Sequence, residues 1–291
     1  MAAASVRRDK IYEELRIALA ATSAQRLKVW GRDSAARLPR LAARRVKNFG
    51  NLLAALAKFT GRELWNAVRA VGEGRFGKHI EKRAANAIDG TIDISKRITQ
   101  STIAIGKTLF DDPKQNAPKV LALAFGFLGG SGGLDGNGGV PDSDIPLLGI
   151  GAHRSVFTHS IIAGTLVEGA ILAVADLADV VCEQLPASNR DPFWGKLIEA
   201  KNSIALQLAK GAGAGIAYHL AVDATLQPAP YHDWPFNMSL EEHQAIMAAN
   251  ALAEGSDVPH KEATTGRKVV KFATDAGNRV WSGVTDLIAR K

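Results

Sequence analysis

The sequence predicts an all-α fold, a multi-helix bundle with a metal site between helices, and three observations support this prediction. Long runs of Ala, Leu, Lys, Arg and Glu favour helix. Hydrophobic residues make up 46% of the chain but aromatic residues only 6%, so aliphatic side chains carry the apolar content. A chain of 291 residues with this apolar content can bury a core, and its apolar residues recur at spacings of three and four.

Residues 1–110 are predicted to form a basic helical N-terminal region. Residues 5–30 place apolar side chains on one helical face, and Gly31 is the expected end of that helix. A second amphipathic helix follows, with an interruption expected at Gly50. Its apolar seam steps by four and three and consists of Ala42, Val46, Phe49, Leu53 and Leu56. The basic side chains that flank the seam are Arg40, Arg44, Arg45, Lys47 and Lys58.

Positive charge is concentrated in this N-terminal region. Residues 1–110 contain 22 Lys and Arg against 9 Asp and Glu, or +13, and the rest of the chain contains 14 against 20, or −6. A basic amphipathic helix is compatible with a solvated face on a helix that packs against its neighbours. It is also compatible with a surface that binds an anionic membrane or nucleic acid. The sequence leaves both interpretations open.

A metal-binding core is predicted over residues 111–255. It begins where a helical pattern ends near Pro113 and the charge balance reverses. An apolar helix over 118–128 leads into the glycine-rich segment 129–139. This segment is either a plain mobile loop or a lid that approaches a substrate closely.

Further helices are predicted over 155–182, 193–226 and 239–253, the last capped by Ser239. A C-terminal amphipathic helix is predicted within 256–291, where core packing or contact in a homo-oligomer would use its apolar face. Glycine inside a helix costs about 1 kcal/mol relative to alanine, which suggests a close helix contact where three glycines recur. These three are Gly211, Gly213 and Gly215.

The sequence also predicts the cellular location. The single Cys182 permits no internal disulfide, and the charged residues 7–16 are not followed by the apolar segment of a signal peptide. The longest uncharged run, 120–134, is shorter than the roughly 20 apolar residues of a spanning helix. We therefore expect a cytoplasmic protein without a spanning helix, and peripheral attachment to the inner membrane stays open.

Metal-ligand chemistry is concentrated in one short stretch. Asp142, Asp144, His153 and His159 fall within 18 consecutive residues. Carboxylate oxygens and imidazole nitrogens are the ligands that divalent zinc, manganese and iron accept together, and zinc is the favoured metal here. Asp142 and Asp144 alternate around one residue, so in an extended loop both would point the same way.

A second candidate group lies about 60 residues downstream. His219 and Asp223 are four residues apart and share one face of an otherwise apolar helix. A simple hydrogen bond between them would satisfy both groups. Buried imidazole and carboxylate groups that converge with the first cluster are more simply satisfied by a cation, so we expect all six side chains to bind metal together.

Three further residues are candidates for catalysis. Arg154, beside His153, could support a ligand or bind an anionic substrate. His232 and Asp233 are candidates for a further ligand or a general acid, although such a pair is more often part of a turn.

These residues form a pattern that resembles the YdjM-like family. The matching segments are PDSD at 141–144, HRSVFTHS at 153–160, YHLAVD at 218–223 and WPF at 234–236. The family is described as LexA-binding, inner-membrane-associated, metal-dependent hydrolases with distant similarity to the all-α zinc-dependent phospholipase C fold. The resemblance covers about 100 residues, so it implies a membrane-associated hydrolase for the core and leaves both ends unexplained.

Two functions from different classes follow. The first is a metal-dependent hydrolase, most simply of a phosphoester, which uses a metal-activated water held by the Asp/His cluster. The second is a non-enzymatic module, stabilised by metal, that binds a membrane surface, nucleic acid or a partner protein through its basic N-terminal helices. A toxin or effector with an N-terminal delivery region is a third, weaker alternative.

Overall fold

The computed structural model describes residues 2–75, 77, 78, 81, 112–148, 153–186 and 188–261. These residues form seven α-helices, two short 3-10 helices and no strand, which confirms the all-α prediction. The helices expected over 81–108 and beyond Pro259 fall almost wholly outside the described residues. The seven helices are α1 Ala2–Ala21, α2 Ala24–Gly72, α4 Pro113–Ser131, α5 Asp144–Leu148, α6 Ile161–Gln184, α7 Pro192–Thr225 and α8 Leu240–Asp257.

The chain divides into two compact units. One unit comprises Met1–Asn48 together with Leu121–Lys291, and the other comprises Phe49–Val120. The first 48 residues therefore pack with the predicted metal-binding core. The division into 1–110, 111–255 and 256–291, which rested on composition and charge, stays a prediction.

The two N-terminal helices differ from the expected ones in where they break. The chain leaves helix only near Thr22 and Ser23, and α2 then runs without interruption through Gly31, Pro39 and Gly50. Nothing lies within 4 Å of a Cβ built at Gly31 or Gly50, so these glycines make no close contact that would favour a break. The predicted end at Gly31 and interruption at Gly50 were wrong, because glycine weakens a helix without ending it.

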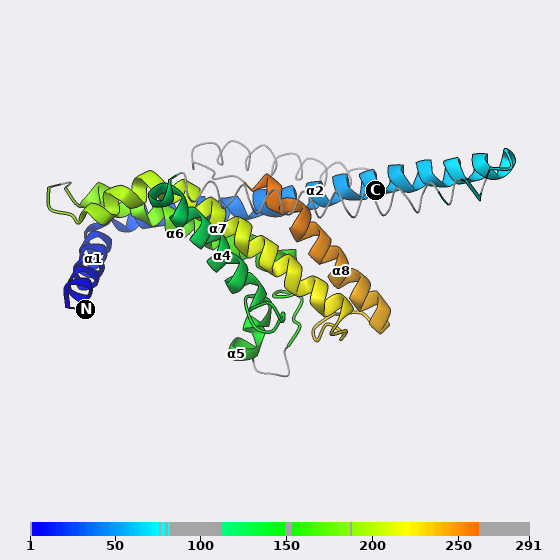
Figure 1. Cartoon of the computed structure of the whole chain (residues 1–291). Helices are drawn as coiled ribbons and strands as arrows, with labels where there is room; N and C mark the ends of the chain where they lie inside the picture. Colours follow the sequence, from blue (N-terminus) through cyan, green and yellow to red (C-terminus); the bar gives the residue numbers. More distant parts are fainter. Residues whose placement is uncertain are drawn as a thin grey trace, which may run out of the picture. The chain divides into compact units, whose positions relative to one another are not determined.

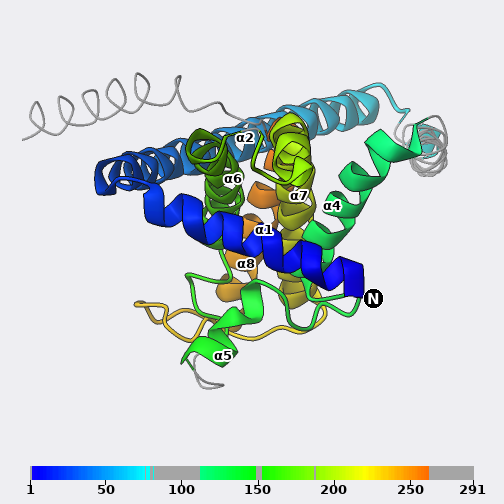
Figure 2. The ribbon, with the colours of Figure 1, turned by 90° about the vertical axis from the view of Figure 1, so that its left-hand side faces the viewer.

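Helices α6, α7 and α8 form the centre of the first unit (Figures 1 and 2). Their starts follow capping rules, because Ser160 accepts a hydrogen bond from Ile162 N–H, and Asp191 accepts one from Phe193 N–H. Ser239 and Glu242 form a capping box at α8, as the sequence predicted for Ser239. The core between α7 and α8 consists of Ile216, Leu220, Ala224, Tyr231, Met247 and Ala251.

Glycines allow α4 and α7 to cross with their backbones almost in contact. A Cβ built at Gly211 would lie 2.0 Å from the carbonyl oxygen of Leu123, and one at Gly215 would lie 2.2 Å from that of Phe127. Gly126 and Gly130 face α7 in the same way from α4. The close helix contact predicted from the glycines of α7 is confirmed. The crossing places the glycine-rich loop after α4 beside the end of α7 that carries His219.

Five buried charged residues and the partly buried Arg44 join α2 to α6, to α8 and to Lys261 beyond α8. Arg44 contacts Glu168 and Asp257 at 2.7 Å, and Arg45 contacts Glu254 at 2.5 Å. Lys261, Glu168, Glu254, Asp257 and Arg45 are all less than 4% exposed. We call this set the ionic network: Arg44, Arg45, Glu168, Glu254, Asp257 and Lys261. Two arginines of the predicted polyanion-binding face are therefore engaged inside the protein, whereas Lys47 and Lys58 are exposed.

Helix α6 is long and apolar enough to cross a membrane, judged by length and composition alone. The core helix of a soluble protein passes the same test, and α6 carries the buried Glu168 of the ionic network. The expectation of no spanning helix rested on the length of uncharged runs, and α6 contains charged residues such as Glu168. It stays a prediction, as do attachment to an anionic surface and a homo-oligomer.

Candidate metal centre

Several loops meet beside α5 (Figure 1), and the candidate ligands come from these segments and from α7. Asp142 lies in a short 3-10 helix, Pro141–Ser143, and Asp144 begins α5. His153 and His159 lie in a turn-rich segment before α6, and His219 and Asp223 project from α7. The expected extended loop around Asp142 was wrong, since a helical turn orients both aspartates instead. The helix predicted to begin at residue 155 begins at Ile161, which places His159 before it.

Each of the six predicted ligands has one buried polar atom without a hydrogen-bond partner. Such atoms are rare in folded proteins because a buried polar group without a partner costs free energy. Two groups of three residues, which share His159, bring their ligand atoms within 4.8 Å of one another. The six unpartnered atoms are Asp142 Oδ1, Asp144 Oδ1, His153 Nδ1, His159 Nε2, His219 Nε2 and Asp223 Oδ2. The sequence-predicted ligands are therefore brought together.

Four of these atoms form a compact inner set. His159 Nε2 lies 3.3 Å from Asp223 Oδ2 and 3.6 Å from Asp142 Oδ1. His219 Nε2 lies 3.4 Å from the same Asp223 oxygen and 3.5 Å from the same Asp142 oxygen. Each of these four separations, between 3.3 and 3.6 Å, is the one expected between two ligand atoms that lie about 2.0 to 2.2 Å from the same tetrahedral zinc ion.

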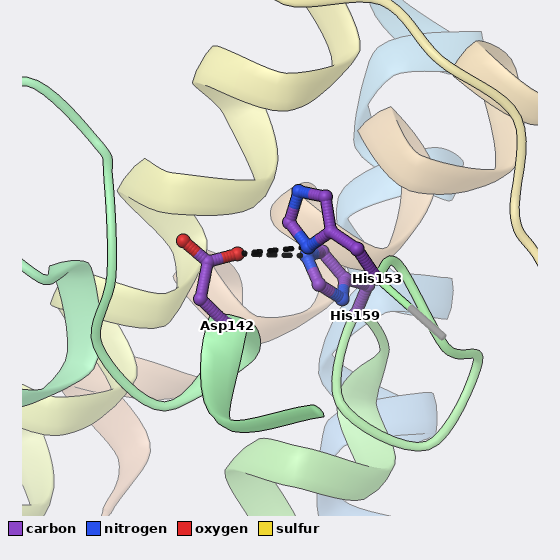
Figure 3. A group of neighbouring side chains, drawn as sticks. All are labelled: Asp142, His153 and His159. Atoms are coloured by element: carbon purple, nitrogen blue, oxygen red, sulfur yellow. Dashed lines mark ion pairs between the residues drawn. The ribbon is translucent and has the colours of Figure 1, made fainter. Parts of the chain in front are cut away.

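Asp142 also faces the more exposed side of the cluster. Figure 3 shows its carboxylate directed at both His153 and His159. His153 Nδ1 lies 3.4 Å from Asp142 Oδ1 and 3.6 Å from Asp144 Oδ1. The side chain of His153 is 34% exposed, whereas those of His159, His219 and Asp223 are at most 3% exposed. His153 therefore has the most exposed side chain of these ligands, although its Nδ1 atom is buried.

Neighbouring groups orient the two buried histidines toward the cluster. His219 Nδ1 lies 3.3 Å from the carbonyl oxygen of Ser131, to which it can donate. His159 Nδ1 lies 3.0 Å from Thr158 Oγ1 and 3.4 Å from Asp144 Oδ2. A proton on each Nδ1 leaves the Nε2 lone pair free, which is the arrangement found behind histidines that bind metal. No sequence signal indicated the carbonyl group of Ser131 as the partner of His219.

Excess negative charge shifts the titration of the cluster. Burial by itself would lower the pKa of His219, but the nearby carboxylates of Asp142 and Asp223 outweigh it and raise the pKa to about 9. Burial would raise the pKa values of Asp142 and Asp223, yet His159 and His219 hold both well below the usual range. The excess negative charge thus favours the protonated forms of His159 and His219.

Arg154 supports Asp223 from behind. Its Nη2 donates to Asp223 Oδ1 at 3.0 Å, while the other oxygen of Asp223 faces the cluster. The residue adopts φ of 67°, a left-handed conformation that is uncommon for a side chain of this size. The guanidinium is buried and its Nε has no hydrogen-bond partner. The strained backbone of Arg154 thus places a positive charge beside the carboxylates.

His232 and Asp233 lie outside the group of six atoms. Asp233 accepts hydrogen bonds from Val156 N–H and Ser155 Oγ at 2.7 Å, so it fastens the segment that carries the histidines. His232 is exposed, and its N–H donates to the carbonyl oxygen of Arg154. This geometry supports the turn interpretation of the pair. The turn that they form was the alternative left open by the sequence.

Comparisons with known proteins found no matching family model, no matching curated protein and no matching solved structure. The function therefore has to be argued from the site itself. Six buried, unpartnered nitrogen and oxygen atoms with these spacings fit a divalent metal ion. The residues do not identify which metal it is.

Proposed function

We propose that the protein is a metal-dependent hydrolase that acts on a phosphoester. The observation that supports this most strongly is the convergence of the six unpartnered atoms, including carboxylates of Asp142, Asp144 and Asp223, on one solvent-reached end of the unit. Zinc is the proposed metal, because imidazole and carboxylate ligands at these spacings suit its tetrahedral shell. Manganese and iron accept the same ligands.

The charge of the centre supports an anionic substrate. Three aspartates and Arg154 give −2 when the histidines are neutral, so metal binding reverses or removes the negative charge that would repel a phosphate. When bound, a divalent cation supplies the nucleophile by lowering the pKa of a water molecule to about 7. Arg154 holds Asp223 in place, and Asp233 holds the segment of His153 in reach of solvent.

The same residues support the proposed relationship to the YdjM-like family. The PDSD, HRSVFTHS and YHLAVD segments contribute all six atoms, so the motif corresponds to one spatial group and not to scattered matches. We propose with it a cytoplasmic protein attached peripherally at the inner membrane. Exposed lysines of α2, such as Lys47 and Lys58, are the candidates for contact with an anionic surface.

The test combines metal content with hydrolysis. The full-length protein is purified without chelator, and its metal content and its hydrolysis of p-nitrophenyl phosphate and bis-p-nitrophenyl phosphate are measured. Asp142→Ala and His219→Ala should lose both metal and activity. His260→Ala is the matched control, because His260 is exposed and lies outside the centre. His232→Ala should keep metal, and any loss of rate would then assign His232 a role in proton transfer.

One observation favours the non-enzymatic alternative. The inner set offers four protein atoms, and a structural metal site closes its shell in this way, whereas a catalytic site keeps an open position. Metal retained with no hydrolysis of any phosphoester, together with a large loss of stability on metal removal, would support a structural role. Retained metal in both Asp142→Ala and His219→Ala would sink the proposed centre.

A further inference from the structure

The six ligand atoms do not surround one point equally. His153 Nδ1 pairs with Asp142 and Asp144, and among the described acidic residues these are its only partners within 4.0 Å. His159 Nε2 and His219 Nε2 instead pair with Asp142 and Asp223. Asp142 Oδ1 is the one atom that is common to both sets.

We propose that the centre holds two divalent cations that share Asp142 Oδ1, an inner one that stays bound and an outer one that exchanges with solution. This inference rests on the metal centre of the proposed function and adds the number of ions and their different lability. The inner position is formed by Asp142, His159, His219 and Asp223. The outer position is formed by Asp142, Asp144 and His153.

The inner position has the properties of a closed site. It offers four ligand atoms, the number that completes a zinc shell, and each imidazole is fixed through its other nitrogen. The side chains of His159, His219 and Asp223 are between 0% and 3% exposed. Loss of this ion would require several ligands to move together, which makes its release slow.

The outer position has the properties of an open site. Three protein atoms leave at least one place in a four-coordinate shell, and His153 is 34% exposed. Asp144 is fixed, since its other oxygen accepts hydrogen bonds from Ser155 N–H at 2.9 Å and Thr158 Oγ1 at 2.8 Å. Asp142 is held likewise, through a hydrogen bond from Gly138 N–H to its Oδ2. The outer position is therefore preformed, and it includes His153, the ligand with the most exposed side chain.

Charge makes the outer ion dependent on an anion from solution. One divalent cation neutralises the −2 of three aspartates and Arg154, and a second leaves +2. That surplus matches the charge of a phosphate monoester dianion or inorganic phosphate. We therefore expect inorganic phosphate to strengthen binding at the outer position and to leave the inner one unchanged.

The experiment counts ions in the full-length protein. Loaded with excess Zn²⁺ and desalted, the wild-type chain should retain about two zinc ions by mass spectrometry, and a brief chelator pulse should leave about one. His153→Ala should retain about one ion that resists the pulse, and Asp142→Ala should retain none. His260→Ala serves as the control with wild-type content. Circular dichroism checks that every variant is folded.

The outcomes separate this inference from the proposed function. A wild-type protein that saturates with one ion, or a His153→Ala variant that still retains two, overturns the two-ion assignment, and hydrolysis by the one-ion protein would leave the proposed function standing. Two ions of different lability without hydrolysis would support the two-ion assignment and contradict the proposed function. Equal release rates for both ions, with or without inorganic phosphate, would refute the distinction between inner and outer positions.

Discussion

Two buried polar clusters lie along α6, and they differ in how the free-energy cost of burying charged groups is offset. The ionic network brings Arg44, Arg45 and Lys261 against Glu168, Glu254 and Asp257, so three positive charges meet three negative ones. The metal centre brings three aspartates against the single cation Arg154. None of the six network side chains has a buried atom without a partner, whereas every proposed ligand has one.

This difference indicates what each cluster needs. A buried charge is tolerated when it is paired and hydrogen-bonded, and the network meets that condition from its own residues. The metal centre does not, and the raised pKa of His219 records its excess negative charge. The network is therefore complete within the chain, and the centre is completed by a ligand from outside.

The largest effect is expected when the network loses one of its cations. Arg45→Met should lower the free energy of unfolding by about 3 to 5 kcal/mol, because Glu254 and Glu168 would stay buried without their main partner. Urea denaturation measures the change. Lys47→Met on the same helix is the control, since Lys47 is exposed and should shift stability by less than about 0.5 kcal/mol. Equal effects of the two substitutions would show that the network does not hold α2.

Acid should weaken the same network gradually. Burial would raise the pKa of Glu168 and Asp257, but Lys261, Arg44 and Arg45 outweigh it and lower both pKa values from 4.5 and 3.8. Groups with a depressed folded pKa contribute stability that is present above the unfolded pKa and is lost as pH falls through the folded pKa. The free energy of unfolding should therefore decrease as pH falls below about 4.5, with a smaller slope in Arg45→Met. An unchanged slope in that variant would contradict the assignment.

An added cation that binds the metal centre should stabilise the protein. Loss of one of the centre's own ligands should change the stability of the metal-free protein less. Added Zn²⁺ at 100 times its dissociation constant should stabilise the wild-type protein by about 2.7 kcal/mol, and Asp142→Asn should gain none of it. Thermal melting with and without chelator measures both. Without metal, the two proteins should differ by less than this gain. Stabilisation of the variant by Zn²⁺ to the wild-type extent would exclude Asp142 as a shared ligand.

The sequence predicted the helical fold and most helix positions after residue 113, because apolar spacing and caps such as Ser239 are local signals. It did not predict that α2 runs through Gly31 and Gly50, since glycine only weakens a helix and does not by itself end it. The ionic network was also missed. Arg45 and Glu254 are far apart in sequence, and a basic amphipathic helix predicts a solvated face in the absence of tertiary contacts.

The candidate ligands were predictable because Asp and His at helical or short spacing are chemically unusual in an apolar context. The division of the six residues into two sets was not, since it depends on which oxygen of Asp142 faces which imidazole. The sequence left open whether His232 and Asp233 form a turn or act in catalysis, and it gave no sign that Asp233 accepts hydrogen bonds from Val156 and Ser155. Local sequence patterns thus identify the candidate ligands, and tertiary geometry decides to which of the two sets each ligand belongs.

The smallest effects concern the helix crossing that positions α7 and its two ligands. Gly215→Ala should lower the free energy of unfolding by about 1 to 3 kcal/mol, because the new Cβ would lie 2.2 Å from the backbone oxygen of Phe127 and the helices would have to separate. Separation would also shift His219, one turn further along α7, so metal affinity should fall although no ligand is changed.

Gly195→Ala in the same helix is the matched control. Nothing lies within 4 Å of a Cβ at Gly195, so the alanine should stabilise the protein by about 0.5 to 1 kcal/mol through its higher helix propensity. Urea denaturation and zinc titration of both variants give the two readouts. If Gly215→Ala were destabilised with unchanged zinc affinity, the crossing would support the fold but would not position the inner ligands. If Gly195→Ala also weakened zinc binding, the effect would not be specific to the crossing.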